Sequence, residues 1–99
     1  MKQIYYHATA FDNLGSILNE GIVPKNMESI TYMCKAPNDC LKFMLVHQIH
    51  EVLMLKVQVD DKDVTEMFDH SYEFFQCRCF GSNKTIDTKD ILSYTKYSL

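Results

Sequence analysis

The 99-residue sequence contains no tryptophan, only two prolines and three glycines, and a single arginine, Arg78. Because proline and glycine are sparse and no segment repeats or is low in complexity, nothing marks a linker between two domains. No apolar run approaches the roughly 20 residues of a membrane span, and no hydrophobic signal segment follows Met1. We therefore expect one domain over residues 1–99, located in the cytoplasm and without a membrane partner.

Positive charge is also scarce in this sequence. Ten lysines and arginines stand against thirteen aspartates and glutamates, which gives a formal net charge of −3. Proteins that bind nucleic acid neutralise several phosphates with clustered basic side chains. The composition therefore disfavours a nucleic-acid partner, and a macromolecular target is expected to be a protein.

The four cysteines are Cys34, Cys40, Cys77 and Cys79. In a reducing compartment cysteines remain thiols, and they are among the most frequently buried residues. Cys77 and Cys79 would point to one face of a strand and with a third ligand could bind zinc, but the repeated C-x₂₋₄-C signature is missing. We therefore interpret the cysteines as small core residues and expect no metal site.

A strand followed by a helix is expected at the start of the chain. Residues 2–9 are rich in tyrosine and isoleucine, as is typical of a strand. Apolar side chains then recur with helical spacing at positions 11, 14, 17 and 18, with Thr9 placed to cap the helix and Gly21 to end it. His7 would lie late in this strand, just before the helix, where ligand contacts are common.

A second strand and a second helix are expected next. Residues 30–34 form a short β-rich run. Pro37 suits the first turn of a helix, and the apolar residues Leu41, Leu45 and Ile49 follow at a spacing of four. With Met44 beside these three residues, the segment is predicted to form a second amphipathic helix.

The rest of the chain is expected to be mostly strand. Residues 52–59 alternate between the two faces of a strand, and the acidic stretch 60–69 is interpreted as a solvated turn or a single helical turn. Further strands are expected over 72–80 and 91–97, with a brief turn at 87–90. The predicted fold class is α+β, with about five strands, two helices near the N-terminal half, and late strands that pair with early ones.

The histidines other than His7 have structural interpretations. His47 and His50 lie near the end of the second predicted helix, where the helix dipole favours such side chains, and an isolated H-x-x-H spacing is a weak metal signature. His70 lies in the acidic stretch and is expected to be solvated.

Several segments resemble the ADP-ribosyltransferase superfamily. The residues YYHAT at 5–9 and FDNLGSILNEGIVP at 11–24 resemble its opening, a strand bearing Y-H-x-T before a helix of the form N-L-x-S-I-L-x-x-G-I. Tyr32, in the run ITYMC, and Glu73, in the run YEFF, stand where this family has a tyrosine and a glutamate, and the run TIDTKDI is similar to its last strand pair. The chain thus resembles the H-Y-E members of the family through His7, Tyr32 and Glu73.

The resemblance implies a split β-sheet that holds NAD in a cleft between its halves. His7 would hydrogen-bond an adenosine-ribose hydroxyl, with a further contact from Thr9, and Tyr32 would pack against the nicotinamide ring. Glu73 would bind the nicotinamide ribose and stabilise the positive charge of the reacting sugar, so Glu73 and Tyr32 would be the catalytic residues. The implied activity is mono-ADP-ribosyl transfer to a macromolecular target. RNA 2′-phosphotransferases have the same fold by this resemblance, but the single arginine disfavours an RNA substrate.

An alternative keeps the fold without catalysis. The acidic stretch contributes five carboxylates: Asp60, Asp61, Asp63, Glu66 and Asp69. Such a surface could imitate nucleic acid towards a basic partner, as in a small phage-encoded inhibitor. A solvated connector explains the same cluster, and the sequence leaves both interpretations open.

Overall fold

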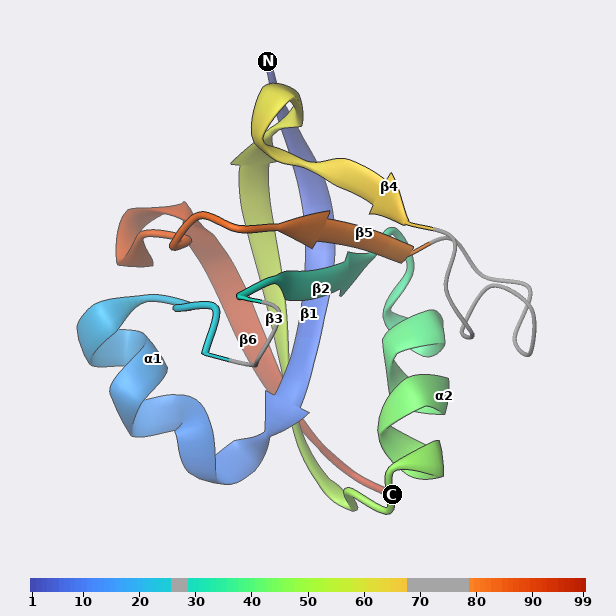
Figure 1. Ribbon diagram of the computed structural model, residues 1–99. Helices are drawn as coiled ribbons and strands as arrows, with labels where there is room; N and C mark the ends of the chain where they lie inside the picture. Colours follow the sequence, from blue (N-terminus) through green and yellow to red (C-terminus); the bar gives the residue numbers. More distant parts are fainter. Residues whose placement is uncertain (26–28, 68–78) are drawn as a thin grey trace.

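The computed structural model of the chain describes residues 1–25, 29–67 and 79–99 (Figure 1). Within these residues the chain is an α+β domain with two α-helices and six strands. The elements in chain order are β1 (Lys2–Ala10), α1 (Leu14–Glu20), β2 (Thr31–Cys34), α2 (Pro37–Val46), β3 (Glu51–Asp60), β4 (Thr65–Met67), β5 (Cys79–Ser82) and β6 (Ile91–Ser98). Short 3-10 turns span Phe11–Asn13, Asp61–Asp63 and Thr88–Asp90. None of the helices in the described ranges is long and apolar enough to cross a membrane.

The strands form one antiparallel sheet in the order β4-β5-β2-β1-β3-β6. The central ladder between β1 and β3 is long and runs from the pair Lys2 and Asp60 to the pair Ala10 and Val52. By contrast, β1 and β2 share a single register pair, Tyr6 opposite Cys34. Figure 1 shows the result: β2, β4 and β5 run across the direction of β1, β3 and β6. The sheet therefore consists of two three-stranded halves that are joined at one point.

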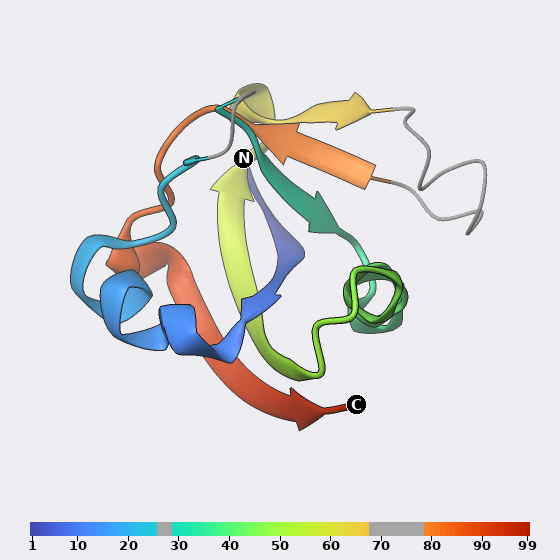
Figure 2. The same ribbon diagram turned by 60° about the horizontal axis from the view of Figure 1, so that its bottom comes forward.

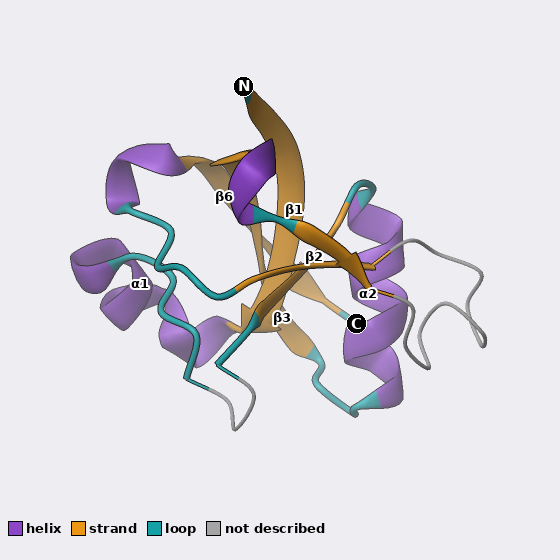
Figure 3. Cartoon of the chain, turned by 45° about the horizontal axis from the view of Figure 1, so that its top comes forward, coloured by secondary structure: helices purple, strands orange, loops and turns teal. Residues whose placement is uncertain are grey.

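The two helices cover opposite faces of β1 and β3, as Figures 2 and 3 show from two directions. Ile17 of α1 belongs to the larger apolar cluster, together with Tyr5 of β1. Cys40 of α2 belongs to a second cluster, against which Tyr6 packs from the other face of β1. Because both faces of β3 are covered, four consecutive residues from Val52 are buried, and the alternation expected for this strand is lost over that stretch.

The turn after α1 is held by a two-way backbone contact. Ile22 and Ile86 exchange hydrogen bonds in both directions, each with an N to O distance of 2.9 Å. Gly21 ends α1 as predicted, with a φ of 82° that a side chain would strain. A Cβ on Gly21 would also overlap the carbonyl oxygen of Ile86, so glycine is required by two separate constraints.

The second helix is confirmed as α2, but only part of its expected apolar set is buried. The buried side chains of α2 are Cys40 and Met44, whereas Leu45 is 53% exposed. The thiol of Cys40 donates to the carbonyl oxygen of Tyr6 at 3.3 Å, which turns this side of the helix towards β1. Leu41 is half-buried and packs against the second cluster, whereas Ile49 lies beyond the end of α2.

Two further predictions are corrected. Thr9 does not cap the first helix: its Oγ1 accepts a hydrogen bond from Nδ2 of Asn13 at 2.8 Å, and the turn before α1 begins after Ala10 without a side-chain cap. The acidic stretch, expected to be a solvated turn or a single helical turn, does contain the 3-10 turn Asp61–Asp63, but it also contains β4, which pairs with β5. The strands predicted at 2–9, 30–34, 52–59 and 91–97 are confirmed as β1, β2, β3 and β6, and β5 and β6 pair with the earlier β2 and β3. Of the strand predicted at 72–80, residues 72–78 lie outside the described residues and only 79–80 are seen, at the start of β5.

Candidate functional site

His7 lies in the middle of β1, opposite Leu55 of β3, and its side chain reaches β2. Its Nδ1 atom is 2.8 Å from the main-chain oxygen of Tyr32. This contact stands next to the Tyr6 and Cys34 pair, where the two halves of the sheet meet. The imidazole therefore ties β1 to β2 at the point where few backbone pairs do so.

The surroundings of His7 fix both its charge and its tautomer. Burial disfavours the charged ring and lowers the pKa of His7 from 6.5 to about 4, so the ring is neutral near pH 7. A carbonyl oxygen only accepts hydrogen bonds, so Nδ1 must carry the proton that it donates to Tyr32. Nε2 is then left as a hydrogen-bond acceptor, which suits a hydroxyl group of a ligand.

Thr9 follows His7 on the same face of β1, because strand side chains alternate. Its hydroxyl oxygen accepts from Asn13, whose carbonyl in turn accepts from the hydroxyl of Ser16 at 3.1 Å. The hydroxyl proton of Thr9 stays available as a donor. Thr9 and His7 therefore place a hydroxyl and an acceptor nitrogen on one face, two residues apart.

Tyr32 meets His7 through its main chain rather than through its ring. By strand alternation the side chain of Tyr32 shares a face of β2 with Cys34, which belongs to the second apolar cluster, on the side of α2. His7 shares a face of β1 with Tyr5, which belongs to the larger cluster, on the side of α1. The half-buried phenol and the imidazole therefore leave their strands on opposite sides of the junction. Glu73, the third predicted site residue, lies outside the described residues, as do His70 and Cys77.

Lys35 is a candidate that the sequence patterns did not indicate. It directly follows β2, and its Nζ atom lies 4.0 Å from the centroid of the Tyr5 ring and 3.4 Å from the carbonyl oxygen of Ile4. Tyr5 in turn packs against Phe80, with ring centroids 5.3 Å apart. Tyr5 shares a face of β1 with His7, so this cation lies on the side of the sheet to which the imidazole belongs. An isolated lysine after a strand belongs to no sequence motif. Its contacts with Tyr5 and Ile4 become visible only when β1 and β2 are paired in the structure.

The acidic stretch is less uniformly negative than its sequence indicates. The carboxylate of Asp63 lies 2.9 Å from Nζ of Lys84. A backbone hydrogen bond from Lys62 is the main reason that the pKa of Asp60 is lowered. Asp61 is exposed, and Asp69 lies outside the described residues. Asp60 and Asp61 also lie 3.5 and 3.4 Å from the N-terminal ammonium of Met1, so at least three of the five carboxylates have an ion-pair partner.

The remaining cysteine and histidine side chains have structural surroundings. Cys34, Cys40 and Cys79 are buried, as predicted for core residues. His47 stands at the end of α2, where its ring packs against Phe43 with centroids 4.5 Å apart. In the ranges that the structure describes, no three His, Cys, Asp or Glu side chains are grouped as metal ligands.

No protein-family model matches this sequence, and no curated protein matches it significantly. Evidence on function therefore comes from the geometry at the junction of β1 and β2 and from the motifs in the sequence.

Proposed function

We propose that the protein binds NAD at the junction of β1 and β2 and transfers its ADP-ribose to a macromolecular target. The acidic composition favours a protein as that target. The observation that carries the proposal is the hydrogen bond from His7 to the main chain of Tyr32. This bond holds a neutral imidazole in the tautomer that presents an acceptor nitrogen, as contact with a ribose hydroxyl requires.

The arrangement of the sheet supports the same function. The two three-stranded halves share one register pair, which is consistent with the split sheet that the ADP-ribosyltransferase resemblance implies. His7 stands at that join, on the strand where the family motif occurs. Lys35 adds a positive charge beside Tyr5, which would partly balance the NAD pyrophosphate in a chain with a single arginine.

The predicted site residues would have separate roles in the transfer of ADP-ribose from NAD. In the transfer, the bond between nicotinamide and ribose breaks, nicotinamide leaves with the bonding electrons, and a nucleophile of the target attacks the sugar and loses its proton. His7 and Thr9 would hold the adenosine ribose. Glu73 would stabilise the positive charge that develops on the sugar. The ring of Tyr32 leaves β2 on the side opposite to His7, so Tyr32 would contribute through its main-chain oxygen, which fixes the tautomer of His7, and not by packing against the nicotinamide ring.

Label transfer from NAD tests this proposal. Incubation of the protein with NAD labelled in its ADP-ribose part and with a cell lysate should label a macromolecule, and the Glu73→Ala variant should lose that label. The matched control is Glu20→Ala, which removes an exposed carboxylate at the end of α1. Label that persists in Glu73→Ala at the wild-type level would contradict the catalytic role of Glu73.

The inhibitor alternative ranks second. It needs a continuous acidic surface, and the ion pair of Asp63 with Lys84 removes part of that surface. A pull-down with the five acidic residues changed to their amides separates the two functions. Loss of a basic partner in that variant, together with unchanged NAD binding, would favour the inhibitor.

A further inference from the structure

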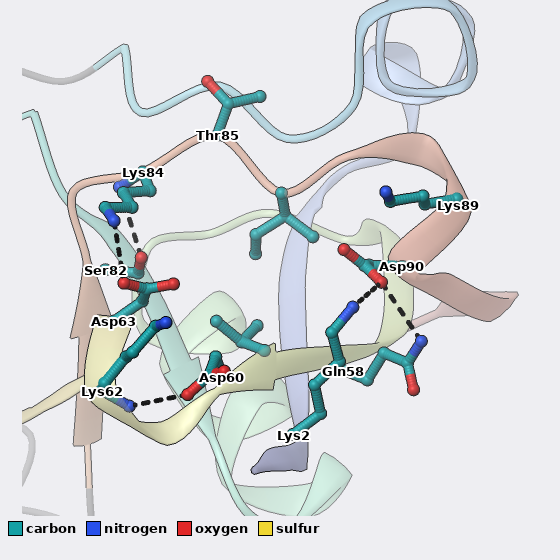
Figure 4. A pocket seen from close by; sticks show the side chains of 12 residues that line it. Lys2, Gln58, Asp60, Lys62, Asp63, Ser82, Lys84, Thr85, Lys89 and Asp90 are labelled. Atoms are coloured by element: carbon teal, nitrogen blue, oxygen red, sulfur yellow. Dashed lines mark hydrogen bonds and ion pairs between the residues drawn. The ribbon is translucent and has the colours of Figure 1, made fainter.

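A pocket of about 270 Å³ lies at the end of the sheet where β1 begins and β3 ends (Figure 4). Lys2 of β1 and Gln58 of β3 line one side of it, and the turn after β3 together with the end of β5 lines the other. Lys2 is five residues from His7 along β1, a separation of about 16 Å at the rise of a strand. The pocket is therefore a separate place from the proposed NAD site.

Two of the lysines that line the pocket are held by aspartates. Nζ of Lys2 lies 2.6 Å from Oδ1 of Asp90, and the same oxygen accepts from Nε2 of Gln58 at 3.1 Å. Nζ of Lys84 lies 2.9 Å from the carboxylate of Asp63. The hydrogen bond from Lys2 is the main cause of the lowered pKa of Asp90, so this carboxylate stays ionised beside its partner. The positive charges of Lys2 and Lys84 are therefore balanced by the negative charges of Asp90 and Asp63.

Two other lysines of the lining lack such a partner. In the part of the chain that the structure describes, the amino groups of Lys62 and Lys89 make no close ion pair, although each attracts an aspartate of the lining at longer range and so helps to lower the pKa of Asp60 and of Asp90 respectively. Figure 4 shows both amino groups directed towards the middle of the pocket, from opposite sides. The remaining carboxylate, Asp60, accepts from the backbone N–H of Lys62 at 3.2 Å.

The net charge of the residues that line this pocket is opposite in sign to the net charge of the whole protein. Its lining holds four lysines against three aspartates, a balance of +1, whereas the chain as a whole carries −3. Close like charges are costly unless an anion or solvent separates them. A buried hydroxyl adds to the site: Ser82 is 2% exposed, and its oxygen accepts from the backbone N–H of Lys84 at 3.3 Å. Its own proton remains available to donate.

We propose that this pocket binds a phosphate dianion, either inorganic phosphate or the terminal phosphate of a small ester. Ammonium groups act on phosphate as point charges and need no planar match, unlike the paired N–H groups of arginine on a carboxylate. Lys62 and Lys89 would supply the two charges, and Ser82 would donate its hydroxyl proton. The volume of about 270 Å³ accommodates a phosphate with a short organic group. This site does not depend on the proposed NAD activity.

Calorimetric titration at constant ionic strength tests the proposal, with inorganic phosphate and glycerol 3-phosphate as the two probes. We expect saturable one-to-one binding of at least one probe, and at least tenfold weaker binding in the double variant Lys62→Gln/Lys89→Gln. The matched control is Lys25→Gln, which removes an exposed lysine that is paired with Glu20 outside the pocket and should bind as the wild type does. Because Lys62 and Lys89 are exposed, the double variant should unfold at the wild-type temperature without phosphate.

The two probes separate the two sources of phosphate. Binding of inorganic phosphate alone assigns the pocket to the free ion, and binding of the ester assigns it to a phosphorylated small molecule. Ser82→Ala is a second variant that should weaken binding while leaving all charges in place. The proposal is overturned if neither probe saturates, or if the double lysine variant binds as tightly as Lys25→Gln.

Discussion

The Nδ1 atom of His7 lies 2.8 Å from the main-chain oxygen of Tyr32, beside the one register pair that joins the two halves of the sheet. The side chain of His7 thus links β1 to β2 at this junction, whereas backbone hydrogen bonds link the strands along the rest of the sheet. The same bond sets the tautomer of the ring and leaves Nε2 as an acceptor. Structural and ligand-binding roles of His7 therefore depend on one contact, and they can be tested separately.

The structural role of His7 predicts a specific dependence of stability on pH. Its pKa is 6.5 in a solvated chain and about 4 in the folded protein, so the unfolded state binds the proton first. The stability from the neutral ring is complete above pH 6.5, falls between pH 6.5 and 4, and changes no further below that. The loss should reach at most about 3 kcal/mol, because the side chain keeps some solvent contact.

Urea unfolding of wild type and His7→Gln at several pH values between 7 and 4 measures the contribution of the neutral His7 ring to the free energy of unfolding. The difference in unfolding free energy between the two proteins should shrink as the pH falls through that range. His50→Gln, which removes an exposed histidine, should follow the wild-type curve. A constant difference between wild type and His7→Gln would show that the ring is not held neutral by the fold.

The turn after α1 gives a second prediction, with two glycines as a matched pair. Gly21→Ala should destabilise the protein by at least about 1–2 kcal/mol, because the positive φ and the carbonyl of Ile86 both exclude a side chain. Gly15→Ala should be neutral or stabilising by up to about 1 kcal/mol, because Gly15 lies within α1 and nothing stands within 4 Å of its added Cβ. Thermal unfolding of both variants tests the contrast, and equal effects would refute it.

The side of α2 that faces the sheet gives a third prediction. Met44→Ala should cost about 2–5 kcal/mol because Met44 is buried. Leu45→Ala should change the unfolding free energy by less than about 0.5 kcal/mol, because Leu45 is mostly exposed. The sequence pattern alone does not separate the two residues, because both belong to the apolar set expected for this helix. Chemical denaturation of the two variants therefore decides whether α2 packs as the structure describes.

Much of the fold could be predicted from local patterns. The β-rich runs of β1, β2, β3 and β6 and the proline at the start of α2 each act within a few residues. The side of α2 that is buried could not be predicted in the same way, because the apolar spacing of Leu41 and Leu45 competes with that of Cys40 and Met44. The choice between them depends on the contact of Cys40 with Tyr6, thirty-four residues away in sequence.

The candidate site shows the same division between local and distant information. The sequence singled out His7 because a motif surrounds it, but the partner that fixes its tautomer is a backbone oxygen, which leaves no trace in a sequence. Lys35 was missed for a related reason, since its neighbours Tyr5 and Ile4 belong to a different strand. The β4 strand was missed because it is short and lies within an acidic stretch, where charge dominates the pattern.

Binding of NAD to the purified protein tests the central claim most directly. Titration of NAD in phosphate-free buffer should raise the unfolding temperature, with a stabilisation of about 2.7 kcal/mol at one hundred times the dissociation constant. His7→Ala should abolish this shift, while His50→Gln should keep it. A wild-type unfolding temperature that does not move with NAD, or an equal shift in His7→Ala, would contradict the assignment of the β1 and β2 junction as a dinucleotide site.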